Sequence, residues 1–182
     1  MIEVVIHGRG GQGSVIASEI LAAAFFREGK QVQAFPSFGS ERRGAPVAAF
    51  LRADENPILL RCQIYKPDSL ILLDPTLVDN PNNFKTLKKG GWVVVNTSQS
   101  LEHIDYLKDF KLAHVDATGI AVKNNLGSRT TAVVNTGICG AFAKVTGYMK
   151  LESVIDSLHE FVPVKLEENK AAAREAFESV IY

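Results

Sequence analysis

The stretch Ile2-Glu3-Val4-Val5-Ile6-His7-Gly8-Arg9-Gly10-Gly11-Gln12-Gly13 decides the fold of this 182-residue chain. Its first residues, 2–6, are a short apolar run rich in β-branched side chains, which is typical of a buried strand. The last six residues match the pattern G-x-G-x-x-G. Residues 14–28 then carry apolar side chains at helical spacing, and Gly29 is a natural helix stop. A strand, a glycine turn and a helix in this order predict the start of a parallel α/β sheet.

Further apolar runs alternate with amphipathic segments along the rest of the chain. The pattern predicts strands over residues 31–35, 45–51, 69–73, 92–95 and 112–115, and helices over residues 130–145, 151–161 and 166–181. We therefore expect an α/β fold, with a mostly parallel Rossmann-like sheet, helices on both faces and a helical C-terminal region. No linker-like stretch divides the chain, so residues 1–182 are expected to form one domain.

Composition narrows the classes of partner. The chain has 20 basic and 20 acidic residues, and this balance gives no support for a nucleic-acid partner. No apolar run approaches the roughly 20 residues that a membrane-spanning helix needs. The run at residues 2–6 is too short for the core of a signal peptide, so we expect a cytoplasmic protein.

The glycine turn suits anion binding. Glycines allow close backbone approach, and a helix N-terminus offers unpaired N–H groups to a phosphate. Dinucleotide binding also requires an Asp or Glu at the end of the second strand. Here that strand ends at Phe35-Pro36-Ser37, and the first acid is Glu41. NAD or FAD binding is therefore disfavoured, and a turn needed only for close packing remains an alternative.

A second polar loop, Ser37 to Pro46, follows the second strand. In a parallel sheet it should lie at the same edge as the glycine turn, bringing Arg42 and Arg43 near Arg9. Arginine guanidinium groups suit phosphate or carboxylate, although Glu41 could neutralise one of them. Ligand binding and contact with another subunit are both open. The candidate ligand contacts are Gly8, Arg9, Gly10, Gly11, Gln12, Gly13, Ser37, Ser40, Arg42 and Arg43.

The sequence shows no catalytic constellation of its own. Cys62 and Cys139 are the two cysteines, whereas an iron–sulfur cluster normally takes four. The four histidines have no metal-ligand spacing, and no nucleophile–base pair is recognisable. We expect no catalytic residue and no metal ligand in this chain.

Several motifs in this order resemble a known family. They are Gly8 to Gly13, Gln33-Ala34-Phe35-Pro36 with Gly39 to Pro46, Asp74-Pro75-Thr76-Leu77, and Asn135-Thr136 followed by Gly140-Ala141-Phe142 and Gly147. They are similar to the gamma subunits of pyruvate:ferredoxin oxidoreductase (pyruvate synthase) and other 2-oxoacid:ferredoxin oxidoreductases. The resemblance covers nearly the whole chain.

This resemblance implies a complex in which alpha, beta and delta subunits hold thiamine diphosphate and iron–sulfur clusters. The complex converts a 2-oxoacid, coenzyme A and oxidised ferredoxin into an acyl-CoA, carbon dioxide and reduced ferredoxin. The gamma chain then has a structural role and contacts coenzyme A, with the glycine turn and Arg42 and Arg43 as candidates for its phosphates. The motifs look most like those of pyruvate enzymes, while 2-oxoglutarate and branched-chain enzymes remain alternatives. A free-standing Rossmann-like nucleotide-binding protein is a further alternative, from a different functional class. The isolated chain is expected to be inactive and able to form a homodimer.

Overall fold

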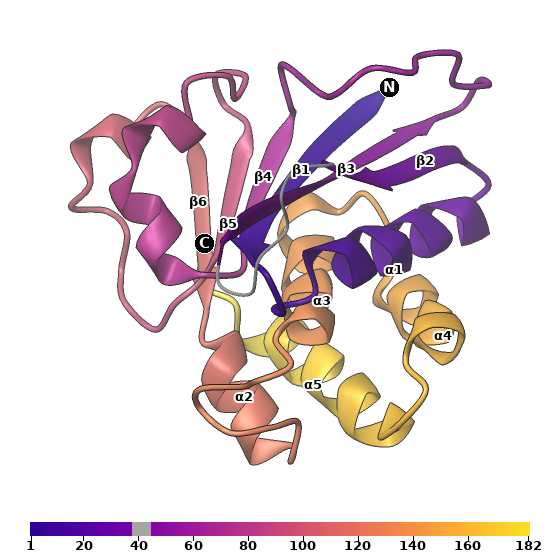
Figure 1. Cartoon of the computed structure of the whole chain (residues 1–182), viewed down its shortest axis with the longest axis vertical. Helices are drawn as coiled ribbons and strands as arrows, with labels where there is room; N and C mark the ends of the chain where they lie inside the picture. Colours follow the sequence, from indigo (N-terminus) through magenta and orange to yellow (C-terminus); the bar gives the residue numbers. More distant parts are fainter. Residues whose placement is uncertain (38–44) are drawn as a thin grey trace.

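In the computed structural model, residues 1–37 and 45–182 are described, and they form a six-stranded sheet with strand order β2-β3-β1-β4-β5-β6 (Figure 1). The strands are β1 (Ile2–Arg9), β2 (Gln31–Pro36), β3 (Pro46–Asp54), β4 (Ser69–Leu72), β5 (Trp92–Asn96) and β6 (Lys111–Val115). The predicted α/β class is confirmed.

Strand β3 runs against its neighbours. Strands β1, β4, β5 and β6 are parallel, whereas β3 pairs antiparallel with both β1 and β2. The sheet is therefore mostly parallel, as expected, but β3 separates the first two strands of the chain. The apolar run that starts near Ala45 predicts a strand here without fixing its direction.

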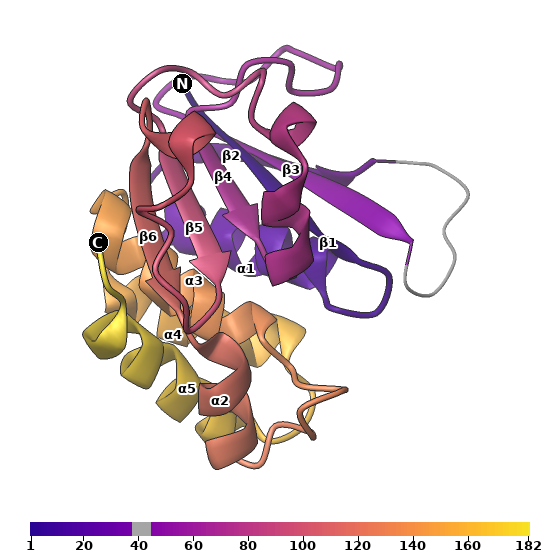
Figure 2. The same cartoon turned by 90° about the vertical axis from the view of Figure 1, so that its left-hand side faces the viewer.

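All five described α-helices lie on one face of the sheet (Figure 2). They are α1 (Ser14–Arg27), α2 (Ala117–Lys123), α3 (Asn135–Thr146), α4 (Leu151–Phe161) and α5 (Leu166–Ser179). Three short 3₁₀ helices and their loops cover the other face: η1 (Pro75–Asp79), η2 (Pro81–Asn83) and η3 (Asp105–Leu107). Helices were expected on both faces, but the described α-helices cover one face only and the other face carries short 3₁₀ helices. Pro75 and Pro81 each begin a 3₁₀ helix, and Pro81 would interrupt a longer α-helix in the β4–β5 connection.

Helices α2, α3 and α5 differ from the sequence prediction by more than one residue. Helix α2 was not predicted, because its seven residues are too few to show a clear periodicity. Helix α3 begins at Asn135 rather than at 130, since Thr131 and Val133 donate backbone hydrogen bonds to Ser128 and Leu126 in a preceding turn. Helix α5 ends at Ser179, and Ile181 forms an antiparallel bridge with His114 of β6.

Close packing of α3 on α5 holds the helical layer together. A Cβ atom added at Gly140 of α3 would lie 2.1 Å from the backbone oxygen of Ala173 of α5. The two helices therefore approach to a distance that only glycine permits. No described helix is long and apolar enough to cross a membrane.

Candidate functional site

The candidate site lies where the parallel strands end. From β1 the chain continues to β2 and β3 on one side, and from β4 it continues to β5 and β6 on the other. In open α/β sheets this reversal of strand order is the usual place of a ligand crevice. The glycine turn follows β1, and the segment that starts at Asp74 follows β4, so both flank the crevice position.

The glycine turn is closed by one of its own side chains. Gly11 and Gly13 adopt φ angles of 99° and 81°, which favour glycine. The Arg9 N–H donates to Gln12 Oε1 at 2.7 Å, and the Gln12 N–H donates to the Arg9 carbonyl at 3.0 Å. Gln12 thus places an uncharged oxygen on a backbone donor that an anion would otherwise use.

A side-chain network ties this turn to the segment after β4. Arg9 donates to Thr76 Oγ1 at 2.7 Å and lies 3.3 Å from Asp74 Oδ2, while Gln12 Nε2 donates to the same carboxylate at 2.9 Å. Partial burial would raise the pKa of Asp74, but hydrogen bonds from Thr76 and Gln12, together with the charge of Arg9, outweigh it and lower that pKa. The Arg9 charge is therefore partly neutralised within the fold.

No side chain in the described part of the chain caps the backbone N–H groups at the N-terminus of α1. Gly13 is the N-cap residue and provides no side-chain cap, and no acid lies in the first turn. The Ser14 hydroxyl is buried and has no hydrogen-bond partner within the described residues. This end of α1 carries a partial positive charge that no carboxylate of its own first turn offsets.

Two of the motifs that carry the family resemblance meet the glycine turn. Asp74 pairs with Arg9 and accepts a hydrogen bond from Gln12. A Cβ atom added at Gly13 would lie 2.6 Å from Asn135 Nδ2, so the first residue of α3 packs directly on the turn. Segments that are about 60 and 120 residues away in sequence therefore form one structural unit with it.

The flanks of the arginine loop lie at this same end of the sheet. The Gly10 N–H donates to the Ala45 carbonyl at 2.9 Å, and the Ser37 N–H donates to the Ala48 carbonyl at 2.8 Å. Ser40, Arg42 and Arg43 fall outside the described residues. Their assignment as ligand contacts stays a prediction.

The strand order also bears on dinucleotide binding. In the dinucleotide-binding fold the end of the second strand supplies the acid that holds the ribose. Here β3 lies between β1 and β2, so the end of β2 stands two strand spacings, roughly 10 Å, from β1. The missing acid and this displacement both argue against an NAD site.

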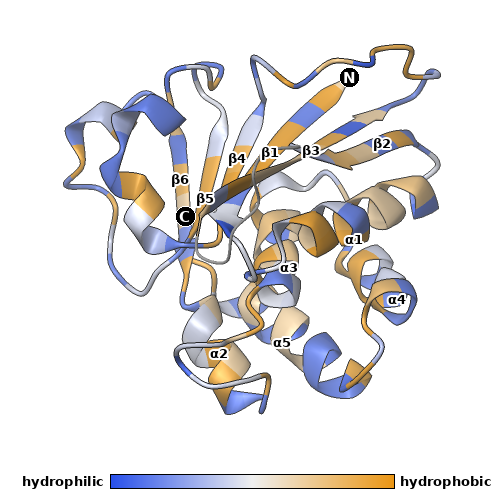
Figure 3. Ribbon diagram, viewed as in Figure 1, coloured by the Kyte–Doolittle hydropathy of each residue, from blue (hydrophilic) through white to orange (hydrophobic). Residues whose placement is uncertain are grey.

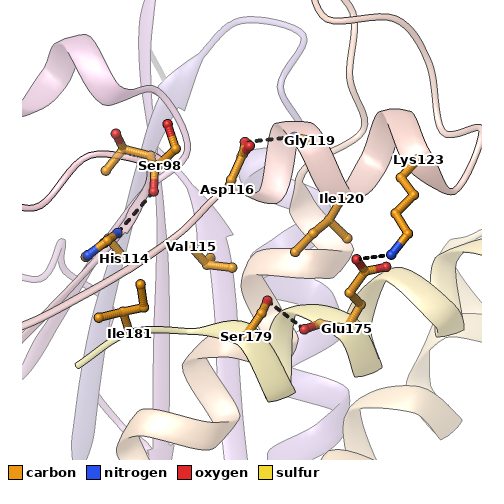
Figure 4. A pocket seen from close by; sticks show the side chains of 11 residues that line it. Ser98, His114, Val115, Asp116, Gly119, Ile120, Lys123, Glu175, Ser179 and Ile181 are labelled. Carbon is orange, nitrogen blue, oxygen red and sulfur yellow. Dashed lines mark hydrogen bonds and ion pairs between the residues drawn. The ribbon is translucent and has the colours of Figure 1, made fainter.

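Polar residues after β5 and β6 line two adjoining hollows that were not predicted from the sequence. One has a volume of about 400 Å³ and is lined by Thr76, Asn96, Gln99 and Thr118, among others. The other, of about 390 Å³, lies between residues 97–98, α2 and α5 (Figure 4). The polar residues that directly follow the predicted strands 92–95 and 112–115 could have indicated these hollows.

Charges in the second hollow are satisfied internally. Lys123 pairs with Glu175 at 2.7 Å, and Asp116 accepts the Gly119 N–H at 2.8 Å as the cap of α2 (Figure 4). Asn96 Oδ1 accepts the Thr118 N–H and Asn96 Nδ2 donates to the Leu73 carbonyl, tying β4, β5 and α2 together. These groups build the rim of the sheet, and none is poised as a base.

Two further groups have shifted pKa values, and neither of them is suited to act as a catalytic base or nucleophile. Burial lowers the pKa of His7 on β1, which favours the neutral imidazole. Burial raises the pKa of the Cys139 thiol, whose Sγ donates weakly to the Ala17 carbonyl at 3.7 Å. A protonated thiol inside the helical layer is unreactive.

The fold and the site together define a Rossmann-like α/β protein with a braced glycine turn at the switch point of its sheet. The family model described as pyruvate ferredoxin/flavodoxin oxidoreductase matches residues 3–179, and the chain belongs to that family.

Relatives of known name match it from end to end. The chain is 53% identical to the pyruvate/ketoisovalerate oxidoreductases common subunit gamma of Thermococcus kodakarensis, over 100% of this chain and 99% of the relative. It is 49% identical to pyruvate synthase subunit PorC of Methanothermobacter thermautotrophicus, over 99% and 96%. The crystal structure of pyruvate oxidoreductase subunit PORC from Thermotoga maritima superposes with a TM-score of 0.82 at 35% identity, covering 99% of this chain and 97% of that one.

Proposed function

We propose that this chain is the gamma subunit of a pyruvate:ferredoxin oxidoreductase complex. The complex would convert pyruvate, coenzyme A and oxidised ferredoxin into acetyl-CoA, carbon dioxide and reduced ferredoxin. The observation that carries this proposal is the end-to-end similarity to relatives named as subunits of pyruvate enzymes, at about half identity. Alpha, beta and delta subunits would hold thiamine diphosphate, which supplies carbanion chemistry, and the iron–sulfur clusters, which carry electrons.

The role proposed for this chain within the complex is structural and coenzyme-contacting. Its cysteines support a role without a redox centre, because Cys139 is buried in α3 while Cys62 is exposed in the β3–β4 connection. The uncapped start of α1 supports contact with a phosphate of coenzyme A. Since Arg9 is engaged by Asp74, the charge for this contact would come from Arg42 and Arg43.

A branched-chain 2-oxoacid enzyme is the second candidate. The relative from Thermococcus kodakarensis is named as a subunit common to pyruvate and ketoisovalerate oxidoreductases. A gamma chain that serves two enzymes would leave the choice of 2-oxoacid to its partners.

Purification of the tagged chain from its native cell tests the proposal. We expect alpha, beta and delta subunits to co-purify, and the complex to reduce ferredoxin with pyruvate and coenzyme A. Ketoisovalerate and 2-oxoglutarate would be assayed in parallel. Turnover of ketoisovalerate alone would replace the first candidate by the second, and recovery of the chain without partners would refute both.

A pair of variants tests the contact with coenzyme A. Replacement of Arg42 and Arg43 by Ala should raise the KM for coenzyme A in the assembled complex and leave the KM for pyruvate unchanged. The control is the double variant Lys85→Ala with Lys89→Ala, because these two lysines precede the start of β5 and are not candidate coenzyme A contacts. Altered assembly with unchanged coenzyme A kinetics would show that the arginines only contact other subunits.

A further inference from the structure

A buried arginine holds the connection between β3 and β4 in place. Residues 55–68 contain no described helix or strand, and they run along the upper edge of the molecule in Figure 1. Arg52 of β3 lies beneath them with 1% of its surface exposed. Apolar and polar stretches alternate along this connection (Figure 3).

Arg52 fixes the backbone of this connection from below. Its Nη1 donates to the Cys62 carbonyl at 2.8 Å and its Nη2 to the Gln63 carbonyl at 3.1 Å. Gln33 of β2 adds a hydrogen bond to the Leu60 carbonyl at 2.9 Å, and the Arg52 charge is balanced by Glu3 at 2.9 Å. Buried ion pairs seldom stabilise a fold more than apolar residues of similar volume would, and what this one provides is a defined backbone path.

That path directs large apolar side chains into solvent. Ile64 is buried against the sheet, whereas Leu59 is 87% exposed, Tyr65 is 68% exposed and Leu60 is 44% exposed. We call Leu59, Leu60, Arg61, Tyr65 and Lys66 the ridge. A ridge whose backbone is already ordered loses little conformational entropy when a partner covers it.

The charges of the ridge select the kind of partner. Arg61 and Lys66 are exposed and have no ion pair among the described residues, and no acid lies between Pro57 and Pro67. A second copy of the chain docked through this ridge would oppose positive charges to positive charges. A groove that is apolar at its centre and carries carboxylates at its rim would complement both features.

We propose that the ridge is the docking surface for another subunit of the oxidoreductase complex, which receives Leu59 and Tyr65 in an apolar groove with carboxylates facing Arg61 and Lys66. This inference rests on the proposed function, because it needs the complex to exist. Beyond the proposed function, it specifies which face of the chain contacts the other subunit and which chemical groups form that contact.

Substitution of the exposed leucine tests the ridge in the complete complex. Leu59→Glu should fold as the wild type does, because the side chain touches little of its own chain, and should weaken association with the other subunits by about tenfold or more. Val164→Glu, which is 69% exposed on the α4–α5 connection, is the matched control and should assemble normally. Association would be measured by titrating the tagged chain into the remaining subunits.

Two more variants separate charge and backbone order from apolar contact. Arg61→Glu with Lys66→Glu should also weaken assembly, with a smaller effect in high salt. Arg52→Met should weaken assembly while leaving the ridge side chains intact, and should speed tryptic cleavage after Arg61.

The outcomes are distinguishable. Failure of the wild-type chain to associate with any other subunit would refute the proposed function. Normal assembly of Leu59→Glu beside an assembling wild type would overturn the ridge alone. Loss of a wild-type homodimer in Leu59→Glu, with heteromeric assembly unchanged, would assign the ridge to a second copy and also overturn the proposal.

Discussion

At the scale of single residues, Gly13 meets two demands at once. It holds a φ of 81° at the start of α1, and it leaves room for the Asn135 side chain. Gly147, the C-cap of α3, has a φ of 62° but open space around it. A substitution at Gly147 therefore introduces backbone strain alone, whereas one at Gly13 introduces both backbone strain and a steric clash.

Alanine at these two positions should have unequal costs. Gly147→Ala should lower the free energy of unfolding by about 1–2 kcal/mol through left-handed strain alone. Gly13→Ala should lower it by about 3–4 kcal/mol, because Asn135 must also move. Denaturant titration of both variants measures the difference, and equal losses would mean that Asn135 yields at no cost.

Asp74 should make stability depend on pH in acid. Its pKa in the folded state lies below the ordinary value of 3.8. Its contribution is therefore complete above 3.8 and is lost as pH falls through the folded-state pKa. Asp74→Asn should be less stable than the wild type by about 1–2 kcal/mol at neutral pH. The gap should narrow as the pH falls below 3.8, and a gap that stays constant down to pH 2 would contradict the assignment.

At the scale of elements, the contact between α3 and α5 contains a matched pair of glycines. An added Cβ at Gly140 would lie 2.1 Å from the Ala173 carbonyl, whereas one at Gly137 would find its nearest neighbour at an ordinary 3.6 Å. Both glycines lie in the same helix.

Alanine should therefore be tolerated at one position and not at the other. Gly137→Ala should be neutral or stabilise by up to about 1 kcal/mol, since alanine favours the helix. Gly140→Ala should destabilise by about 3 kcal/mol by forcing α3 away from α5. Thermal unfolding followed by circular dichroism compares them, and tolerance of Gly140→Ala would show that the helices can slide apart freely.

Elements with a strong local pattern were predictable. The first strand, glycine turn and helix were found from residues 2–28 alone, and α4 was placed at its observed bounds. The direction of β3 was not, because an apolar run reads the same in both directions. The network of Arg9, Gln12 and Asp74 was also missed, since Asp74 lies in the connection after β4, 62 residues beyond Gln12.

At the scale of the whole molecule, strand order separates this chain from dinucleotide-binding enzymes. Insertion of β3 moves the end of β2 away from the glycine turn, and Gln12 already occupies a donor of that turn. We expect the isolated chain to show no binding of NADH by calorimetry or by nicotinamide fluorescence. Saturable binding would mean that the turn opens and that a site is built without the acid of the second strand.

The candidate site was only partly predictable from the sequence, because it depends on how distant segments come together in the whole molecule. The glycine turn and the flanks of the arginine loop do meet at one end of the sheet, as parallel strands require. The exposed ridge, in contrast, depends on Arg52, whose burial beneath a loop could not be foreseen from a residue type that is usually exposed.

Burial of Arg52 with Glu3 has a consequence for life at high temperature. The hydration of charged groups becomes less favourable on heating, so the cost of removing this pair from water falls while the gain from apolar burial levels off. The arginine should thus hold its loop most effectively in the range where other contacts stop gaining strength, and a hot environment would favour keeping it over an uncharged replacement.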